Sequence, residues 1–197
     1  MQRKHLLMVS MCIVLAGVGW FAKGVYIQAK AMLAQQLLED AWQQTLDGED
    51  RVKPWSWADT WPVARLAFPG KDVELIVLDG ASGSSLAFGP GYLHGTAQPG
   101  QFGFSVISAH RDTHFRFLQG VRRGDQILLQ QANGATREYK VVKMKVVDQA
   151  QPVIPQTEQV RGLMLVTCYP FNALKAGGRL RYVVYAVEVD EKDVVSL

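Results

Sequence analysis

The larger part of this chain is built from short apolar runs, each closed by residues that break regular structure. From Pro62 onward, runs of aliphatic and aromatic residues alternate with glycine, proline, aspartate and asparagine. Runs of this length and composition are typical of β-strands. The Asn133-Gly134 pair, which separates two of them, is a strong signal for a β-hairpin. We therefore expect strands at 63–68, 73–78, 104–109, 125–130, 137–147, 163–167 and 180–189.

This density of strands restricts the fold class of residues 61–197, which we assign to one domain. Roughly seven or eight short strands within about 130 residues predict an all-β domain, either a closed barrel or a sandwich. A single helical turn is expected at 115–118. The sequence contains no internal repeat that would indicate a repetitive architecture.

Residues 1–28 have a different composition and predict a membrane anchor. Residues 6–22 form an uncharged apolar run of 17 residues. The run reaches the ~20 residues that span a bilayer if the Lys23 side chain extends to the interface. Basic residues before it favour a cytoplasmic N-terminus. A cleaved signal peptide is the alternative, with Ala29-Lys30-Ala31 as the cleavage site, but the run is longer than a usual signal-peptide core. We favour a single-pass anchor in the cytoplasmic (inner) membrane, with the bulk of the chain outside.

Residues 29–60 are expected to form a helical stalk and a linker. Leucine, alanine and tryptophan recur at helical spacing over residues 31–46, and Asp47-Gly48 is a signal for the end of a helix. Three tryptophans follow at positions 55, 57 and 61. They fit either a belt at the membrane interface or a cover for one edge of the folded domain, and we favour the cover.

The overall charge argues against a nucleic-acid-binding protein. The formal net charge is +3, with 20% charged residues, and the basic residues are spread along the chain without a long run. With 48% hydrophobic residues the composition is that of an ordinary globular protein.

Cys168 is the candidate reactive residue of the predicted domain. It follows the apolar run Leu165-Val166-Thr167 and precedes a proline two residues later. The chain has two cysteines, and the other, Cys12, lies in the apolar N-terminal run, so no disulfide partner is in reach. An unpaired cysteine in an exported domain is either a small buried apolar side chain or a working thiol.

His110 and Arg181 would complete a site for acyl transfer. A thiol is nucleophilic as its thiolate, and an imidazole beside it serves as acid and base. A guanidinium supplies fixed donors to the oxyanion of a tetrahedral intermediate. Arg179, two residues before Arg181, would share its strand face and is the rival for this role. We favour Arg181.

Other histidine-based sites are weaker interpretations. His110 and His114 have a metal-binding spacing only on a helix, whereas a strand end is predicted there, so we expect no zinc site and no cofactor. The segment His94-Gly95-Thr96 resembles part of an L,D-transpeptidase motif, but the cysteine of those enzymes follows a different tripeptide that is absent here.

The segments LVTCYPF, RYVVYA and VISAHRDTHFRFL together resemble the sortase family. The resemblance covers residues 61–189. The forms WPVARLAFPG, SSLAFGPGYLHGTAQPG and CYPF are most similar to the class found in Gram-negative proteobacteria. The resemblance implies a closed eight-stranded β-barrel in which Cys168 is the nucleophile, His110 the acid and base, and Arg181 the oxyanion anchor. Their neighbours Thr167 and Ala109, together with Arg179, are expected to contact the substrate.

The implied activity is that of a cysteine transpeptidase. Such an enzyme cleaves a sorting signal of LPxTG type near the C-terminus of a substrate protein, forms a thioacyl enzyme and passes the acyl group to an amine, which this sequence does not identify. Residues 146–160, with Pro152 and Pro155, are expected to join two strands beside the peptide groove. A non-enzymatic, membrane-anchored β-domain that binds peptides is the alternative.

Overall fold

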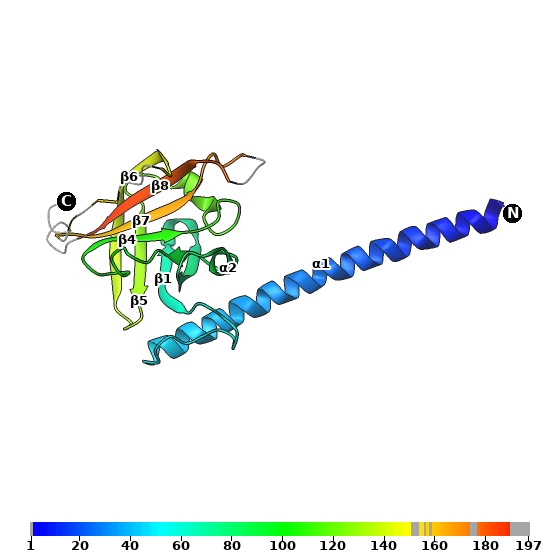
Figure 1. Ribbon diagram of the computed structural model, residues 1–197, viewed down its shortest axis with the longest axis horizontal. Coiled ribbons are helices and arrows are strands. Elements are labelled where there is room, and N and C mark those ends of the chain that lie inside the picture. Colours follow the sequence, from blue (N-terminus) through cyan, green and yellow to red (C-terminus); the bar gives the residue numbers. More distant parts are fainter. Residues whose placement is uncertain (1, 151–153, 156, 158, 174–176, 190–197) are drawn as a thin grey trace. The chain divides into compact units, whose positions relative to one another are not determined.

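The computed structural model describes residues 2–150, 154–155, 157, 159–173 and 177–189. The chain divides into two compact units, Met1–Leu37 and Leu38–Leu197. A single helix, α1 (Gln2–Leu46), contributes to both of them (Figure 1).

The first unit consists of the N-terminal part of α1. The helix is long and apolar enough to cross a membrane, and none of its most apolar stretch is buried within the protein. Because an exposed apolar surface of this length is unfavourable in water, the helix fits a membrane anchor. It continues without a break past residue 28, and the expected boundaries at 28 and 60 stay predictions.

The last turns of α1 belong to the second unit. Leu38, Ala41, Trp42 and Thr45 are buried, and their spacing of three or four residues places them on one face of the helix. The predicted helix end is also present. After Leu46 the backbone N–H of Gly48 donates to the carbonyl oxygen of Thr45 at 3.1 Å, and Gly48 has a φ of 100°, which glycine adopts without strain.

The second unit contains a closed eight-stranded barrel, as the family resemblance implied (Figure 1). Its strand order is β1-β2-β3-β4-β7-β8-β6-β5, and β5 pairs with β1 to close the sheet. Most neighbours are antiparallel, but β2 with β3 and β4 with β7 are parallel. The strands are β1 (Pro62–Phe68), β2 (Val73–Asp79), β3 (Gly91–Tyr92), β4 (Gly103–Ser108), β5 (Gln126–Gln131), β6 (Thr136–Asp148), β7 (Arg161–Cys168) and β8 (Leu180–Glu188).

All seven expected strands are present within two residues of their predicted ends, and β3 is the addition. Gly91 falls in none of the expected strands, yet it pairs with Leu78 of β2 and Ser108 of β4. A Cβ atom at Gly91 would lie 2.3 Å from the carbonyl oxygen of Gly80, so only glycine fits this strand. The short helices are η1 (Pro69–Lys71), α2 (Gly83–Leu86) and η2 (Arg116–Gly120), the last near the expected helical turn.

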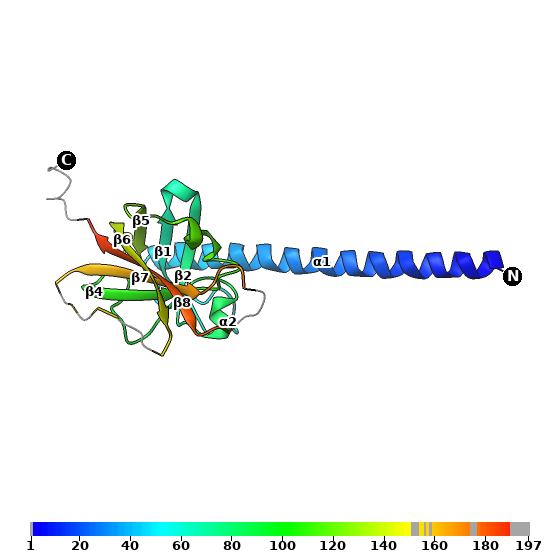
Figure 2. The same ribbon diagram turned by 90° about the horizontal axis from the view of Figure 1, so that it is seen from above.

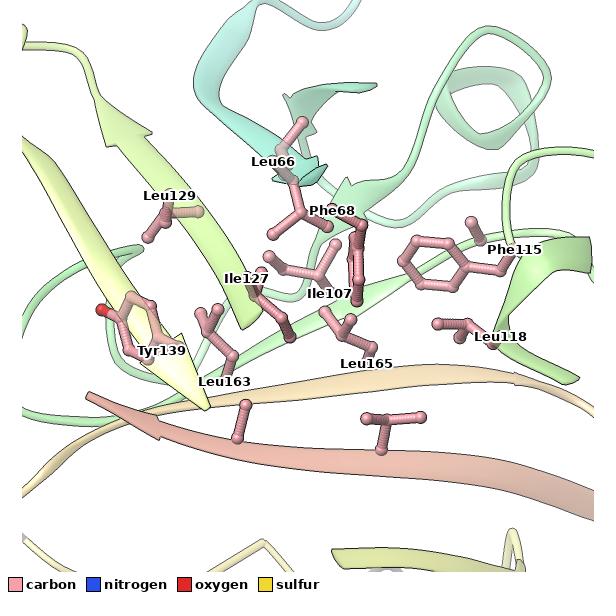
Figure 3. Packing of buried hydrophobic residues seen from close by; sticks show 14 of the residues in the cluster. Leu66, Phe68, Ile107, Phe115, Leu118, Ile127, Leu129, Tyr139, Leu163 and Leu165 are labelled. Atoms are coloured by element: carbon pink, nitrogen blue, oxygen red, sulfur yellow. The ribbon is translucent and has the colours of Figure 1, made fainter. Parts of the chain in front are cut away.

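The barrel interior holds the main hydrophobic core (Figure 3). Side chains from different strands, including Leu66, Ile107, Ile127 and Leu163, converge on its centre and are fully buried. Phe115 and Leu118, next to or within η2, close one side of this cluster. Burial of these apolar side chains, at ~1.5–3 kcal/mol each, is the main driving force for the barrel.

A second, smaller apolar cluster lies on the outer face of the barrel wall. Because side chains alternate along a strand, Leu163 and Leu165 of β7 point inward while Met164 and Val166 point outward. β4, β7 and β8 run side by side here (Figure 2). We call this cluster the outer strip: Phe104, Val106, Met164 and Val183, with Val147, Ile154, Val166, Tyr185 and Val187 packed against them.

The three tryptophans do not share one environment. The Trp55 ring packs edge-on against Phe88, with ring centroids 4.7 Å apart. The Arg51 guanidinium lies 5.5 Å from the centre of the Trp61 ring. Trp57 is 80% exposed. Trp55 and Trp61 therefore cover part of the folded unit, as favoured from the sequence, whereas Trp57 does not.

Candidate active site

Cys168 is the last residue of β7 and lies at one end of the outer strip. It occupies the same strand face as Met164 and Val166, which are four and two residues earlier. The thiol is unpaired and partly exposed. The strand therefore presents the sulfur on the outer wall of the barrel and not in the interior core.

Arg181 is the direct cross-strand neighbour of Cys168. The two residues are paired in the antiparallel ladder of β7 and β8, so their side chains share one face of the sheet. Arg181 Nη1 donates to the carbonyl oxygens of Gly178 at 2.6 Å and Leu180 at 2.9 Å, and Nη2 donates to the Gln149 side chain. Among the described residues no carboxylate pairs with this guanidinium, so neutral acceptors hold it beside the thiol without cancelling its charge.

Arg179 lies one residue before β8. Its carbonyl oxygen accepts a hydrogen bond from the Gln149 backbone N–H at 2.9 Å. Its side chain is 71% exposed and pairs with Asp148 at 3.1 Å. The expectation that Arg179 and Arg181 stand on one strand face stays a prediction.

His110 is brought to the same end of the sheet by the pairing of β4 with β7. Ser108 is the partner of Val166, and the backbone N–H of Ala109 donates to the Val166 carbonyl oxygen at 3.2 Å. If this register continued for two more residues, His110 would lie opposite Cys168, and that placement stays a prediction. The His110 side chain is exposed. The strand ends next to the three candidate residues therefore meet at one edge of β4, β7 and β8.

Thr167 and Ala109 are buried and bind each other. The Thr167 hydroxyl donates to the Ala109 carbonyl oxygen at 2.7 Å, and the residues are 2% and 6% exposed. Contact of their side chains with a substrate stays a prediction, which this burial does not favour. Their hydrogen bond instead ties the residue before His110 to the residue before Cys168.

Arg111 was missed by the sequence reasoning. It is only 5% exposed, and its guanidinium donates to Asp112 and to the carbonyl oxygens of Pro170 and Ala173. The hydrogen bond from Arg111 is the largest influence that lowers the pKa of Asp112. The sequence gave little signal for this role. An arginine between a histidine and an aspartate at a strand end is usually an exposed charge.

A hollow of about 720 Å³ is formed by residues that follow His110 and Cys168 in the chain. Neither His110 nor Cys168 lines it. A second hollow, of about 570 Å³, shares none of its residues. The larger hollow is lined by Arg111, Asp112, Arg116, Gln119, Tyr169, Pro170, Phe171 and Asn172.

The remaining histidines have partners outside this site. His94 Nε2 lies 3.0 Å from both carboxylate oxygens of Asp79. His114 is partly buried, and burial lowers its pKa, an effect that nearby His110 reinforces and a hydrogen bond to the Ala87 backbone opposes. In the described part of the chain, no three histidine, cysteine, aspartate or glutamate residues are grouped to hold a metal ion.

Residues 66–189 match the family model of the sortase domain. The chain is also similar to Sortase D of Bacillus subtilis (strain 168), with 33% identity over 125 residues. That segment is 63% of this chain and 62% of the relative, so the chain spans less than two thirds of the relative's length.

Solved structures share the fold. A Clostridium perfringens Sortase D5 transpeptidase is 20% identical, with a TM-score of 0.63, and the match covers 81% of this chain and 99% of that one. Sortase C from Clostridium perfringens, solved with the C-terminal cell wall sorting motif, is 21% identical, with a TM-score of 0.59 and coverage of 82% and 90%. At these identities the likeness concerns the barrel and not the chemistry.

Proposed function

The chain belongs to the sortase family, and from that premise we propose that it is a membrane-anchored cysteine transpeptidase. It cleaves an LPxTG-like sorting signal at the C-terminus of a substrate protein after the threonine. It holds the new acyl end as a thioester on Cys168 and transfers it to an amine. In the first half of this reaction it acts as a thiol peptidase.

One observation carries the proposal: the partly exposed thiol of Cys168 lies directly across the β7–β8 ladder from a guanidinium that no described carboxylate neutralises. A buried structural cysteine does not require a charged neighbour on the same face. A nucleophile that must generate an oxyanion does, because fixed donors stabilise the charge that develops in the transition state.

Each residue then has a defined step. Cys168 Sγ attacks the threonine carbonyl carbon, and Arg181 donates hydrogen bonds to the resulting oxyanion. His110 gives a proton to the leaving amine as the C–N bond breaks. In the second half, His110 takes a proton from the incoming amine, the new C–N bond forms, and the Cys168 thiolate leaves. The balance is one amide for another, so no cofactor or oxidant is consumed.

The substrate proposal rests on the outer strip. Its central residues are buried, but Val147, Val166 and Tyr185 are partly exposed. These side chains fit the leucine and proline of a sorting signal, which gain by leaving water. Ile154, from the expected groove segment 146–160, packs on this strip, while Pro152 lies outside the described residues. The structure of Clostridium perfringens sortase C with a sorting motif supports this class of ligand. The amine acceptor is left open, and water in its place would give hydrolysis.

The location and subclass are parts of the same proposal. The apolar part of α1 anchors the chain in the cytoplasmic membrane with the N-terminus inside, because basic residues flank the run on that side. The barrel then faces the periplasm. The forms WPVARLAFPG and CYPF support the class found in Gram-negative proteobacteria.

The two cysteines provide the test of the activity. The full chain in detergent should cleave a quenched fluorescent LPxTG-type peptide, and Cys168→Ala should abolish cleavage while circular dichroism remains unchanged. Cys12→Ser is the matched control, because it removes the other thiol and should leave turnover intact. Cleavage by a folded Cys168→Ala protein would overturn the mechanism, and peptide binding without cleavage by the unmutated protein would favour the non-enzymatic alternative.

The anchor has its own test. The full chain is expressed in a Gram-negative host, and the N-terminus of the mature protein is determined from membrane and soluble fractions. We expect membrane-bound protein that retains residues 6–22. A soluble periplasmic form beginning at Met32 would show that the chain is cleaved after Ala31.

A further inference from the structure

Arg111 makes four side-chain hydrogen bonds, more than Arg181 or Arg179. Nη1 donates to the Pro170 carbonyl oxygen at 2.6 Å, and Nη2 donates to the Ala173 carbonyl oxygen at 3.0 Å. Nε and Nη2 donate to the two carboxylate oxygens of Asp112 at 2.9 and 3.2 Å. One buried guanidinium thus joins the segment that follows His110 to the segment that follows Cys168.

Burial of the Arg111 guanidinium is unfavourable unless its N–H groups have hydrogen-bond acceptors. Taking a charged group out of water is unfavourable when the group is left unpaired. Arg179, by contrast, is largely exposed and makes a single ion pair with Asp148. Arg111 offsets its burial with a carboxylate and two carbonyl oxygens in a planar fork, a geometry that lysine cannot reproduce.

The contacts of Arg111 complete a pair of ties around the two reacting residues. On one side, the Thr167 hydroxyl binds the carbonyl oxygen of Ala109, so the residues before Cys168 and before His110 are joined. On the other side, Arg111 binds Pro170, so the residue after His110 is joined to the loop after Cys168. His110 and Cys168 each stand between these two cross-connections.

We propose that Arg111 is a positioning residue that fixes the His110 imidazole relative to the Cys168 sulfur. The inference rests on the proposed function for the roles of His110 and Cys168. Its physical reason is that acid–base catalysis requires the donor and the reacting atom within hydrogen-bond reach, and a misplacement of about 1 Å can cost on the order of 10²-fold in rate. The Thr167–Ala109 and Ala109–Val166 hydrogen bonds join the segments before the two residues, and Arg111 joins the segments after them.

A direct effect of charge is the competing explanation. The Arg111 guanidinium also interacts electrostatically with Cys168, so its charge alone could favour the thiolate. Lysine separates the two explanations. Arg111→Lys keeps a positive charge near the thiol but cannot bind Pro170, Ala173 and Asp112 at once.

The experiment uses the full chain in detergent with Arg111→Lys and Arg111→Ala. Arg123→Lys is the matched control, since Arg123 is exposed and lies outside the site. We expect both Arg111 variants to lower kcat for the LPxTG-type peptide by about 10- to 100-fold, with KM changed less than about threefold. Millimolar guanidinium should partly restore Arg111→Ala, and methylammonium should not. Normal kcat in Arg111→Lys would overturn the positioning role in favour of charge.

A double-mutant cycle with His110→Ala tests whether Arg111 acts through the histidine. The readout is the rate at which iodoacetamide alkylates Cys168 at one fixed pH, which needs no sorting peptide. If Arg111 positions His110, then Arg111→Lys slows alkylation in the normal background and adds nothing in His110→Ala. Full additivity would contradict the proposal. Absence of peptide cleavage by the unmutated protein would refute the proposed function and leave this cycle still decisive.

Asp112→Asn keeps the inference testable if the Arg111 variants fail to fold. The Asp112 side chain is 68% exposed, so its substitution does not disturb the core, yet it weakens two of the four hydrogen bonds of Arg111. We expect kcat and the alkylation rate to fall several-fold. An unchanged kcat together with an unchanged alkylation rate would contradict the positioning role of Arg111.

Discussion

Arginines occur at both ends of the β7–β8 pair. At one end their charge is paired with a carboxylate, and at the other end it is bound by neutral acceptors. At the end where β7 begins, Arg161 and Arg137 share the carboxylate of Glu188, at 3.0 and 2.6 Å. The Arg161 guanidinium also lies 3.7 Å from the centre of the Phe102 ring. Burial acts to raise the pKa of Glu188, but hydrogen bonds from both arginines lower it below its usual value. This end is a paired, structural cluster.

At the other end of the same two strands, Arg181 faces a thiol. Its partners are backbone carbonyl oxygens and the side-chain amide of Gln149, which hold the guanidinium without neutralising it. An arginine on this ladder therefore supports stability where a carboxylate is supplied. At Arg181, where no carboxylate of the described residues pairs with the guanidinium, the positive charge is available to a ligand.

Arg181→Ala should give the largest effect on activity. Loss of a charged oxyanion donor should reduce turnover by about 10²–10³, equivalent to ~3–4 kcal/mol, with the fold intact by circular dichroism. Arg181→Lys should also cost heavily, since a point charge does not reproduce the guanidinium fork. Peptide cleavage measures both.

Arg179→Ala is the control for that comparison. Arg179 is exposed and already paired with Asp148, so its loss should leave turnover within about threefold. Near-normal turnover in Arg181→Ala beside an inactive Arg179→Ala would reverse the assignment of the oxyanion donor.

Glu188→Gln should show the converse pattern at the structural end. Removing the shared carboxylate leaves two arginines without their charged acceptor, so we expect a loss of about 1.5–3 kcal/mol in unfolding free energy and normal turnover. Because the pKa of Glu188 is lowered in the folded state, its contribution is present above the unfolded pKa and is lost as pH falls through the folded pKa. The stability gap between the two proteins should therefore close in acid.

Glu74→Gln is the matched control for Glu188→Gln. Glu74 also pairs with an arginine, Arg65, at 2.6 Å, but its side chain is 57% exposed. Exposed pairs contribute less than about 1 kcal/mol. An equal loss of stability in the two variants would show that the Glu188 cluster is an ordinary surface ion pair.

His114 should make the stability of the folded unit sensitive to a different pH range. Its pKa is lowered in the folded state, mainly by burial, so the unfolded chain takes up the proton first as pH falls. Stability should thus be constant above about pH 6.5 and decrease below it, by less than about 1.4 kcal/mol per pH unit. Thermal unfolding of His114→Gln between pH 7.5 and 5.5 should show a shallower decrease, and an unchanged slope would contradict this origin.

Tyr139→Phe should have the smallest effect and the opposite sign. The Tyr139 hydroxyl is buried without a hydrogen-bond partner among the described residues, and burial together with Glu188 raises its pKa to about 12. Removing an unsatisfied buried hydroxyl is expected to be neutral or to stabilise by up to about 1 kcal/mol. A loss above that value in denaturant unfolding would mean that the hydroxyl has a partner in solution.

The strands were predictable because each carries its own signal of apolar residues between breakers, as 163–167 and the Asn133-Gly134 hairpin show. β3 was not, since its pairing depends on the close approach of Gly91 to Gly80, which belongs to the tertiary fold. The catalytic candidates were proposed from their positions at the ends of apolar strands and from the family resemblance, and their roles stay predictions. Arg111 was missed because its acceptors, Pro170 and Ala173, are distant backbone atoms that no local pattern records.

The most direct test of the account is to trap the acyl enzyme. The full chain is mixed with an LPxTG-type peptide, quenched in acid and analysed by intact-mass and peptide-mapping mass spectrometry. The account predicts a mass increase equal to the peptide acyl portion, located on Cys168 and released by hydroxylamine, with more adduct when acceptor amines are absent. Peptide cleavage without an adduct on Cys168 would contradict it. Full activity after Cys168 has been alkylated would contradict it as well.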